Sequence, residues 1–395
     1  MKILFIHTFY QIKGGEDNVF QQEFNLFKQV HNTKSLIFNN KSGVIGFFQF
    51  IFSVYNFISS KKLASIIKKY HPDIIHIHNF HYSASPTIIR TARSLNIPVV
   101  LTIHNYRLLC PSGSLMDNGE IFTDSVNSSF PWKAIQKKVF HNSYLMTFWL
   151  AFVVWFHKRI GTWNLVDRYI VLSEFAKDLF VSSSLGVPSE KFVVKPNFVT
   201  QPISYSAERK PHFLFIGRLS QEKGIEVLLN TFLNSHYTIK IAGDGPLVEK
   251  VKKVSEANAT IHYLGILNKE EVIQEMQQCQ ALIFPSIWYE GMPMTIIEAF
   301  SLGTPVIASN LGAMASMIQD GYNGFHFTPG DSDSLLTMLD KWSSLTDVKK
   351  QLFYKNALDT YRKNYTPEAN YEMLMDIYQA VIDSHAKTKQ PEAIV

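Results

Sequence analysis

Short apolar runs alternate with helical stretches along all 395 residues, and this alternation restricts the fold more than any other feature. Nearly continuous apolar strands joined by helices are typical of parallel sheets that are covered on both faces. A chain of this length usually exceeds one hydrophobic core. The sequence therefore predicts an α/β protein with two doubly wound, Rossmann-like domains and a cleft between them. The expected strands are Lys2–His7, Ser35–Phe38, Asp73–His78, Pro98–His104, Tyr169–Ser173, Phe192–Lys195, Phe213–Gly217, Thr238–Ala242, Ile261–Gly265, Ala281–Pro285, Pro305–Ser309 and Gly324–Phe327.

A polar stretch with several prolines, 195–211, has the character of an interdomain linker. We place the N-terminal domain at 1–200 and the C-terminal domain at 201–365. Residues 366–395 are expected to form a helix that packs back on the N-terminal domain, followed by a polar tail that begins near Ser384. Open parallel sheets bind ligands beyond the carboxyl ends of their strands, so chemistry should be sought there.

Charge divides unevenly between the two halves. Residues 1–200 carry 21 Lys and Arg against 11 Asp and Glu, whereas residues 201–395 carry 17 against 22. The basic half also contains two very apolar stretches, 43–60 and 144–156, flanked by lysines and arginines. These stretches either lie in a membrane interface, where apolar area and attraction to anionic lipids add, or form core helices of the first domain.

Cysteine usage and the N-terminus bear on the cellular compartment. Cys110 and Cys279 are far apart, which indicates a reducing compartment without a disulfide framework. The initial apolar run is too short for a secretory signal and is expected to be a strand. We therefore expect a cytoplasmic protein, bound peripherally to the inner face of the cytoplasmic membrane. The basic residues are not gathered into a platform that would favour nucleic acid.

A pair of glycines follows the first predicted strand. Gly14 and Gly15 precede a helix expected over Asn18–Val30, and such glycines let a phosphate or sugar approach free amides under a favourable dipole. An ordinary turn with Asp17 as the N-cap explains the same residues. The loop does not match the dinucleotide-binding fingerprint.

Two cations follow the first strand of the second half. Arg218 and Lys223 come after a strand that ends at Gly217, so both can converge on one diphosphate and neutralise it as it leaves. The alternative is a solvated loop in which Arg218 pairs with Glu222.

Residues 288–310 contain two glutamates in otherwise apolar surroundings. A helix is expected to begin near Met294 and Thr295 and to stop before Gly303. A carboxylate on such a helix is costly unless its lone pairs are satisfied. We expect the helix N-terminus to face phosphate and Glu298 to accept the two hydroxyls of a ribose, while Glu290 on the preceding loop reaches the sugar carried by the phosphate.

These motifs resemble glycosyltransferase family 4, whose members are retaining enzymes of the GT-B fold that use nucleotide-sugar donors. The resemblance rests on Glu290 and Glu298, on the stretch 217–224, on Gly243-Asp244-Gly245-Pro246, on Gly14-Gly15, and on the patterns 72–79 and 101–111. It implies that Arg218 and Lys223 hold the pyrophosphate and that His104 contacts the donor sugar. Gly217, Gly291, Met292 and the backbone of Met294 and Thr295 complete the expected donor site. Related sequences often carry a cysteine pair that 119–125 lacks, so the loop 110–130 does not indicate an acceptor.

Two patterns could suggest a metal. His76, His78 and His81 lie at a strand end, but no carboxylate or cysteine is spaced in the sequence to complete a site. Asp331-Ser332-Asp333 resembles a metal-binding pair of aspartates, yet it precedes a helical pattern and is interpreted as a helix cap. We expect no metal and no cofactor.

The expected function is transfer of a sugar from a UDP- or GDP-sugar to a hydroxyl acceptor, with retained configuration. The setting is bacterial polysaccharide, lipopolysaccharide or capsule synthesis, with a glycan or polyprenyl-linked acceptor and an anionic membrane surface as partners. His104, Arg218, Lys223 and Glu290 are the candidate catalytic residues. The alternatives are a nucleotide-sugar 2-epimerase of the same fold and a non-catalytic membrane-associated scaffold.

Overall fold

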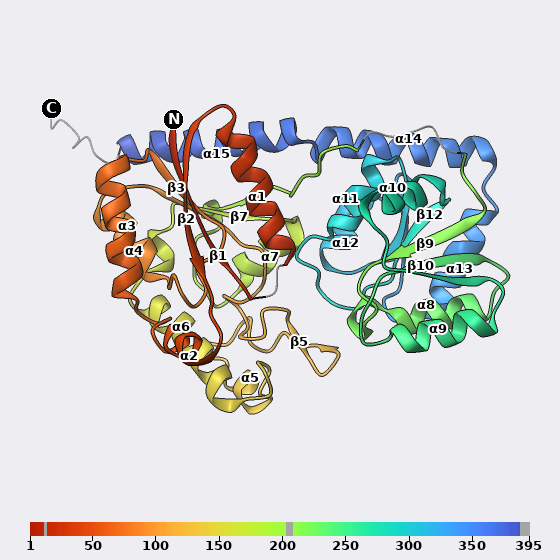
Figure 1. The fold of residues 1–395 in the computed structure, drawn as a ribbon, viewed down its shortest axis with the longest axis horizontal. Coiled ribbons are helices and arrows are strands. Elements are labelled where there is room, and N and C mark those ends of the chain that lie inside the picture. Colours follow the sequence, from red (N-terminus) through yellow and green to blue (C-terminus); the bar gives the residue numbers. More distant parts are fainter. Residues whose placement is uncertain (12–13, 203–207, 388–395) are drawn as a thin grey trace. The chain divides into compact units, whose positions relative to one another are not determined.

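The computed structural model describes residues 1–11, 14–202 and 208–387, which divide into two compact units. Unit 1 consists of Met1–Asp117, Phe122–Pro196 and the chain from Asn370 onward (Figure 1). Unit 2 consists of Asn118–Ile121 and Asn197–Ala369. The boundary after Pro196 thus lies four residues before the one expected after residue 200. The boundary after Ala369 lies four residues after the one expected after residue 365.

Unit 1 is built on a six-stranded parallel sheet in the order β2-β1-β3-β4-β7-β8. The chain order changes direction between β1 and β3, and such a switch point is where doubly wound sheets bind ligands. The strands of this sheet are β1 (Lys2–Phe9), β2 (Asn32–Asn39), β3 (Ile74–Ile77), β4 (Val99–Thr102), β7 (Arg168–Val171) and β8 (Phe192–Val194). A separate two-stranded sheet consists of β5 (Met116–Asp117) and β6 (Glu120–Ile121).

Helices pack around the sheet of unit 1, apart from α2, which buries none of its residues. They are α1 (Gly15–Lys28), α2 (Gly43–Ile51), α3 (Phe57–Tyr70), α4 (Thr87–Ser94), α5 (Trp132–Gln136), α6 (Tyr144–Arg159), α7 (Glu174–Ser182), α15 (Pro367–Lys387) and the short 3₁₀ helices η1 (Trp163–Leu165) and η2 (Ser189–Lys191). One core cluster joins β1 and α1 to α15, where Phe5 and Phe27 pack with Tyr378. The last helix is therefore an integral part of this core.

Unit 2 contains a second six-stranded parallel sheet, in the order β11-β10-β9-β12-β13-β14. Its switch point lies between β9 and β12. The elements are β9 (His212–Ile216), η3 (Gln221–Lys223), α8 (Ile225–Leu233), β10 (Thr238–Ala242), α9 (Val248–Ala257), β11 (Ile261–Gly265), α10 (Lys269–Gln278), β12 (Ala281–Phe284), α11 (Met294–Ser301), β13 (Val306–Ser309), α12 (Gly312–Met317), β14 (Gly324–Phe327), α13 (Ser332–Ser343) and α14 (Asp347–Asn364). Two buried clusters fill the two faces of this sheet.

Every predicted strand is present, with ends that differ by a few residues. The prediction for the first helix was wrong at its start, because α1 begins at Gly15 rather than Asn18. The polar tail was also placed too early, since α15 runs through Ser384 to Lys387. Part of the predicted linker, residues 203–207, lies outside the described residues.

The two apolar stretches of the basic half differ in burial. None of the residues of α2 is buried, so its interpretation as a core helix is wrong. Helix α6 buries one side, including Leu150 and Val153, and leaves Leu145 82% exposed. Among the residues that the structure describes, no helix combines the length and the apolar character needed to cross a bilayer.

Candidate functional site

The switch point of unit 2 brings two predicted site residues together. Lys223 lies on the loop after β9, and Glu290 lies on the loop after the neighbouring strand β12. Lys223 Nζ is 2.6 Å from Glu290 Oε1, which also accepts a hydrogen bond from the Ser286 hydroxyl at 2.6 Å. The ammonium lies 5.2 Å from the centre of the Trp288 ring. This pair is 67 residues apart in sequence and meets only because its strands are adjacent.

Close backbone packing fixes the loop that carries Lys223. Gly224 has φ of 72°, and a Cβ there would lie 1.9 Å from the carbonyl oxygen of Pro285. The amide of Ile287 donates to Glu222 O at 3.0 Å, which binds the same two loops together. Only glycine permits this approach, because any side chain would push the β9 loop away from the β12 loop.

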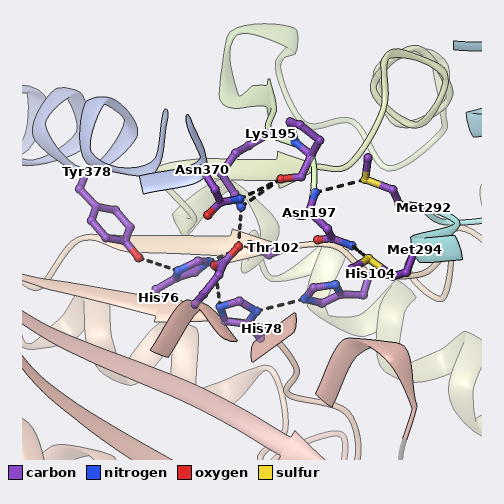
Figure 2. Close-up of polar contacts among 12 residues, drawn as sticks. His76, His78, Thr102, His104, Lys195, Asn197, Met292, Met294, Asn370 and Tyr378 are labelled. Atoms are coloured by element: carbon purple, nitrogen blue, oxygen red, sulfur yellow. Dashed lines mark hydrogen bonds and ion pairs between the residues drawn. The ribbon is translucent and has the colours of Figure 1, made fainter. Parts of the chain in front are cut away.

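The helix predicted within residues 288–310 is confirmed as α11, with Pro293 at its N-cap and Gly303 just past its end. Its first amides, from Met294 and Thr295, have no acceptor within the helix, as at any helix start. The side chains of Met292 and Met294 are held by Asn197, whose amide nitrogens lie 3.2 and 3.6 Å from the two sulfur atoms (Figure 2). This helix end is therefore fixed beside Gly291 and the Glu290 loop.

Glu298 lies on the first part of α11 and is partly buried. Its carboxylate makes no hydrogen bond or ion pair with any described residue. Burial raises the pKa of this carboxyl group, and the charge of Lys269 opposes the shift. A carboxylate that is desolvated without a partner has capacity for hydroxyl donors.

Arg218 also lacks a polar partner within the described part of the chain, and its side chain is exposed. The expected alternative, a pair with Glu222, is not formed, because Glu222 Oε1 instead accepts from the hydroxyl of Ser220 at 2.6 Å. Gly217 precedes Arg218 and bonds to Ala242 O, which places both residues at the carboxyl edge of the sheet.

Unit 1 places His104, Gly14 and Gly15 at the carboxyl edge of its own sheet. The adjacent strands β3 and β4 are each followed by a His-Asn pair, His78-Asn79 and His104-Asn105. The two imidazoles stack with their centres 5.3 Å apart, and His78 Nδ1 lies 3.1 Å from His104 Nε2. Burial, together with the charge of His78, lowers the pKa of His104 well below its usual value.

The two asparagines hold a carboxylate that sequence analysis did not single out. Asn79 Nδ2 donates to Glu16 Oε1 at 2.7 Å, and Asn105 Nδ2 lies 3.4 Å from Glu16 Oε2. Burial raises the pKa of Glu16 to about 7, an effect that the charge of Asp17 increases and that of Arg107 opposes. Glu16, His104 and both asparagines line one pocket at this edge. The His-Asn pair that follows both strands was the signal for this pocket in the sequence. When two such strands are adjacent, the residues that follow them lie side by side.

A buried ion pair supports the histidines. Glu23 of α1 pairs with Lys195, which follows β8, and both side chains are fully buried. Glu23 Oε2 lies 3.4 Å from His78 Nε2. Burial alone would raise the pKa of Glu23, but the charge of Lys195, aided by His78, holds it well below the usual value.

Glu23, His76 and His78 offer three possible ligand atoms within 4.8 Å of one another, so the expectation that no carboxylate joins these histidines was wrong. Both ring nitrogens of His76 are nevertheless engaged, at 2.7 Å, by the hydroxyls of Tyr378 and Thr102 (Figure 2). The ammonium of Lys195 already supplies a positive charge to Glu23. His81 is not part of this group. The donor set therefore favours an internal polar network over a metal site, and Asp331 caps α13 as expected.

Gly14 and Gly15 take different places at the start of α1. Gly14 is the N-cap, and Gly15 is the first helical residue. Asp17 is not the N-cap; it accepts the Gly14 amide at 2.9 Å and lies 2.7 Å from His7 Nε2. Of the predicted residues, Gly14, Gly15 and His104 thus lie in unit 1, and the remainder lie in unit 2.

Comparisons with known proteins agree with this architecture. The family model described as glycosyl transferases group 1 matches residues 200–358, and the model described as glycosyltransferase family 4 matches residues 40–200. The chain resembles the O-antigen chain mannosyltransferase C of Escherichia coli, with 24% identity over 51% of this chain and 58% of that protein. It also resembles an uncharacterized glycosyltransferase of Methanocaldococcus jannaschii, with 29% identity over 40% of this chain and 44% of that protein. These alignments span about half the length of the relatives.

A solved structure with a similar fold is Anabaena HepE in complex with UDP, at a TM-score of 0.67 and 17% identity, covering 96% of this chain and all of that one. Two doubly wound units with polar residues at their sheet edges define an α/β protein of the GT-B fold. The chain belongs to glycosyltransferase family 4, which the two family models match in turn along its length.

Proposed function

We propose that the protein transfers a sugar from a nucleoside diphosphate sugar to a hydroxyl of a growing bacterial polysaccharide or lipopolysaccharide, with retained configuration. One observation carries this proposal: the unit 2 switch point combines the Lys223–Glu290 pair and the start of α11 with unpartnered charges on Arg218 and Glu298. Two cations and a helix N-terminus suit a diphosphate, and a free carboxylate suits a ribose diol.

In this mechanism the bond between the anomeric carbon and the diphosphate oxygen breaks, and a bond to the acceptor oxygen forms on the same face. Arg218, Lys223 and the amides of Met294 and Thr295 stabilise the charge that develops on the leaving diphosphate. The acceptor proton passes to a departing phosphate oxygen. Glu290 and His104 orient the donor sugar, and no metal or cofactor is required.

The acceptor is proposed to bind unit 1, at the pocket that contains Glu16, Asn79 and Asn105. A glycan hydroxyl can exchange hydrogen bonds with a carboxyl group whose pKa lies near neutrality. The polyprenyl-linked form of this acceptor and a peripheral position on the inner face of the cytoplasmic membrane are part of the proposal. The exposed apolar helix α2 and the basic charge of residues 1–200 support them.

A thermal-shift screen of UDP- and GDP-sugars in the presence of EDTA tests the donor. A ligand that binds only the folded chain raises the melting temperature, so the true donor should stand out, and the Arg218→Ala variant should show a smaller shift. If no nucleotide sugar shifts the melting temperature, the proposal fails. Incubation with the donor alone separates the 2-epimerase alternative, which would release an epimerised nucleotide sugar.

A further inference from the structure

A large apolar groove in unit 1 lies outside the site described above. It is formed by α2, α6 and the residues just before α6, with a volume of about 1090 Å³. Phe47, Phe50 and Ile51 line it from α2, and Met146, Phe148 and Trp149 line it from α6. The two helices lie side by side (Figure 1) and are joined by a hydrogen bond of 2.7 Å from Trp149 Nε1 to Phe50 O. Such a volume exceeds that of most small-molecule pockets.

The walls of this groove leave apolar surface in water. Phe47 is 60% exposed and Leu145 is 82% exposed, and no residue of α2 is buried. Contiguous exposed apolar surface on a globular protein marks a binding site or a membrane contact. Helix α2 is nevertheless held in place, because the Gln49 side chain bonds both Lys41 N and Asn39 O. The groove is therefore a fixed feature rather than a collapsed surface.

The groove has a cationic polar end. Arg107, Lys41 and His141 line it, and it contains no Asp or Glu among its described lining residues. Arg107 has no ion-pair partner in the described chain; its Nη1 donates to Pro111 O, and its buried Nε makes no hydrogen bond. The hydroxyl of Tyr10 also lines the groove and interacts with the Arg107 guanidinium. Glu16 lies within electrostatic reach of Arg107 but does not line the groove, so this end of the groove has cationic side chains and no carboxylate, which suits an anion.

Hydrogen bonds lead from this cationic end to the acceptor pocket. The amide of Arg107 donates to Asn105 Oδ1 at 3.0 Å, and Asn105 Nδ2 lies 3.4 Å from Glu16. Arg107 also lowers the pKa of Glu16, which places the two charges within electrostatic reach. An amphiphile with its chain between α2 and α6 and an anion at Arg107 would thus direct its head group towards Glu16.

We propose that this groove binds the lipid of the acceptor, a single isoprenoid chain that carries the glycan through a phosphate. The inference rests on the proposed function, because it assigns the lipid carrier of the acceptor to a specific site. A concave groove with an anion-binding end suits one chain with a phosphate. The outer faces of α2 and α6 remain for contact with a bilayer.

The test is calorimetric titration of the full-length protein with farnesyl phosphate, below its critical micelle concentration, alongside farnesol and inorganic phosphate. Farnesyl phosphate should bind saturably, farnesol at least about tenfold more weakly, and inorganic phosphate without saturation, since apolar contact and charge both contribute. Equal affinity for farnesol would overturn the phosphate assignment. Absence of farnesyl phosphate binding would overturn the groove proposal.

Two variants on one helix separate the groove from a bilayer-binding face. Phe47→Asp changes an exposed residue that lines the groove, and Val44→Asp places the same charge on the same helix outside the lining. Phe47→Asp should weaken farnesyl phosphate binding at least about tenfold and Val44→Asp less than about twofold. Equal losses in both variants, or loss only of binding to anionic vesicles, would assign α2 to the bilayer and refute the proposal.

A measurement of donor binding distinguishes failure of the lipid-site proposal from failure of the proposed function on which it rests. In the Phe47→Asp variant the melting-temperature shift caused by the nucleotide sugar should equal that of the unmodified protein, because Phe47 is not one of the proposed donor-binding residues, most of which lie in unit 2. Farnesyl phosphate binding without any nucleotide-sugar binding would overturn the proposed function and leave the lipid site standing.

Discussion

The two sheets use charge differently at their carboxyl edges. In unit 1, buried carboxylates have partners inside the protein, as Glu23 pairs with Lys195 and Asp17 forms a hydrogen bond with His7. In unit 2, Arg218 and Glu298 have no polar partner among the described residues, although Lys223 and Glu290 pair. Charges that are paired internally hold side chains in position, whereas unpaired charges have capacity left for a ligand. The comparison thus separates an edge that positions histidines from an edge that suits an anionic ligand.

The largest effect should come from breaking the buried pair of unit 1. Lys195→Met leaves Glu23 buried without its counter-charge, so the free energy of unfolding should fall by about 3–5 kcal/mol, measured by urea denaturation. Removing both charges in Glu23→Leu with Lys195→Met should recover much of that loss. The exposed Lys250–Glu226 pair is the control, and Lys250→Met should leave the midpoint unchanged. If the free energy of unfolding fell less in Lys195→Met than in the double variant, the buried Glu23–Lys195 ion pair would not have the stabilising role assigned to it.

Arg218→Ala should have the opposite profile, with a large effect on turnover and none on stability. Its side chain is exposed and contacts no polar group in the described chain, so unfolding should not change. If it stabilises the leaving diphosphate, kcat should fall by about 10²–10³-fold in a donor-release assay. Arg168→Ala, which changes another arginine at the start of β7, is a control for removal of positive charge. Near-normal turnover would remove Arg218 from the site.

The stability of the protein should depend on pH through Glu16, which lines the pocket of unit 1. Because the folded-state pKa of Glu16 is raised to about 7, its protonated form is favoured by folding. The stability that this provides is complete below the unfolded value of 4.5 and is lost as the pH rises through about 7. The shift corresponds to at most about 3 kcal/mol. Glu16→Gln should therefore remove a decrease in the urea midpoint between pH 5 and pH 8, and an unchanged pH profile would refute the raised pKa.

Substitution of Glu298 should have the smallest effect. The direction of the change in the free energy of unfolding distinguishes a binding role of Glu298 from a structural one. Glu298→Ala should weaken nucleotide-sugar binding about tenfold, measured by calorimetry, because two hydroxyl hydrogen bonds to a carboxylate are lost. The free energy of unfolding should stay the same or rise, since a desolvated carboxyl group with a raised pKa is removed. Glu298→Gln keeps the shape and should retain part of the affinity. Destabilisation without loss of affinity would make Glu298 a structural residue.

The sequence by itself determined the strands, the two doubly wound sheets and the ends of α11, because periodicity, glycine and proline act locally. It also placed Arg218, Lys223 and Glu290 at one edge of the sheet of unit 2, since the residues that follow parallel strands lie there, while the roles of these residues and of Glu298 stay predictions. The start of α1 was missed because Asp17 caps the helix from within rather than before it.

Only the tertiary structure decided which charges meet. Glu23 and Lys195 are 172 residues apart and pair because α1 and the end of β8 come together in unit 1, and no local pattern encodes that. Strand adjacency likewise brought the Asn79 and Asn105 side chains onto Glu16. Burial of α2 could not be predicted, because an apolar helix has the same periodicity whether protein, lipid or water covers it. The local sequence determines the helices and strands, and the order of the strands in each sheet determines which residues meet at the site.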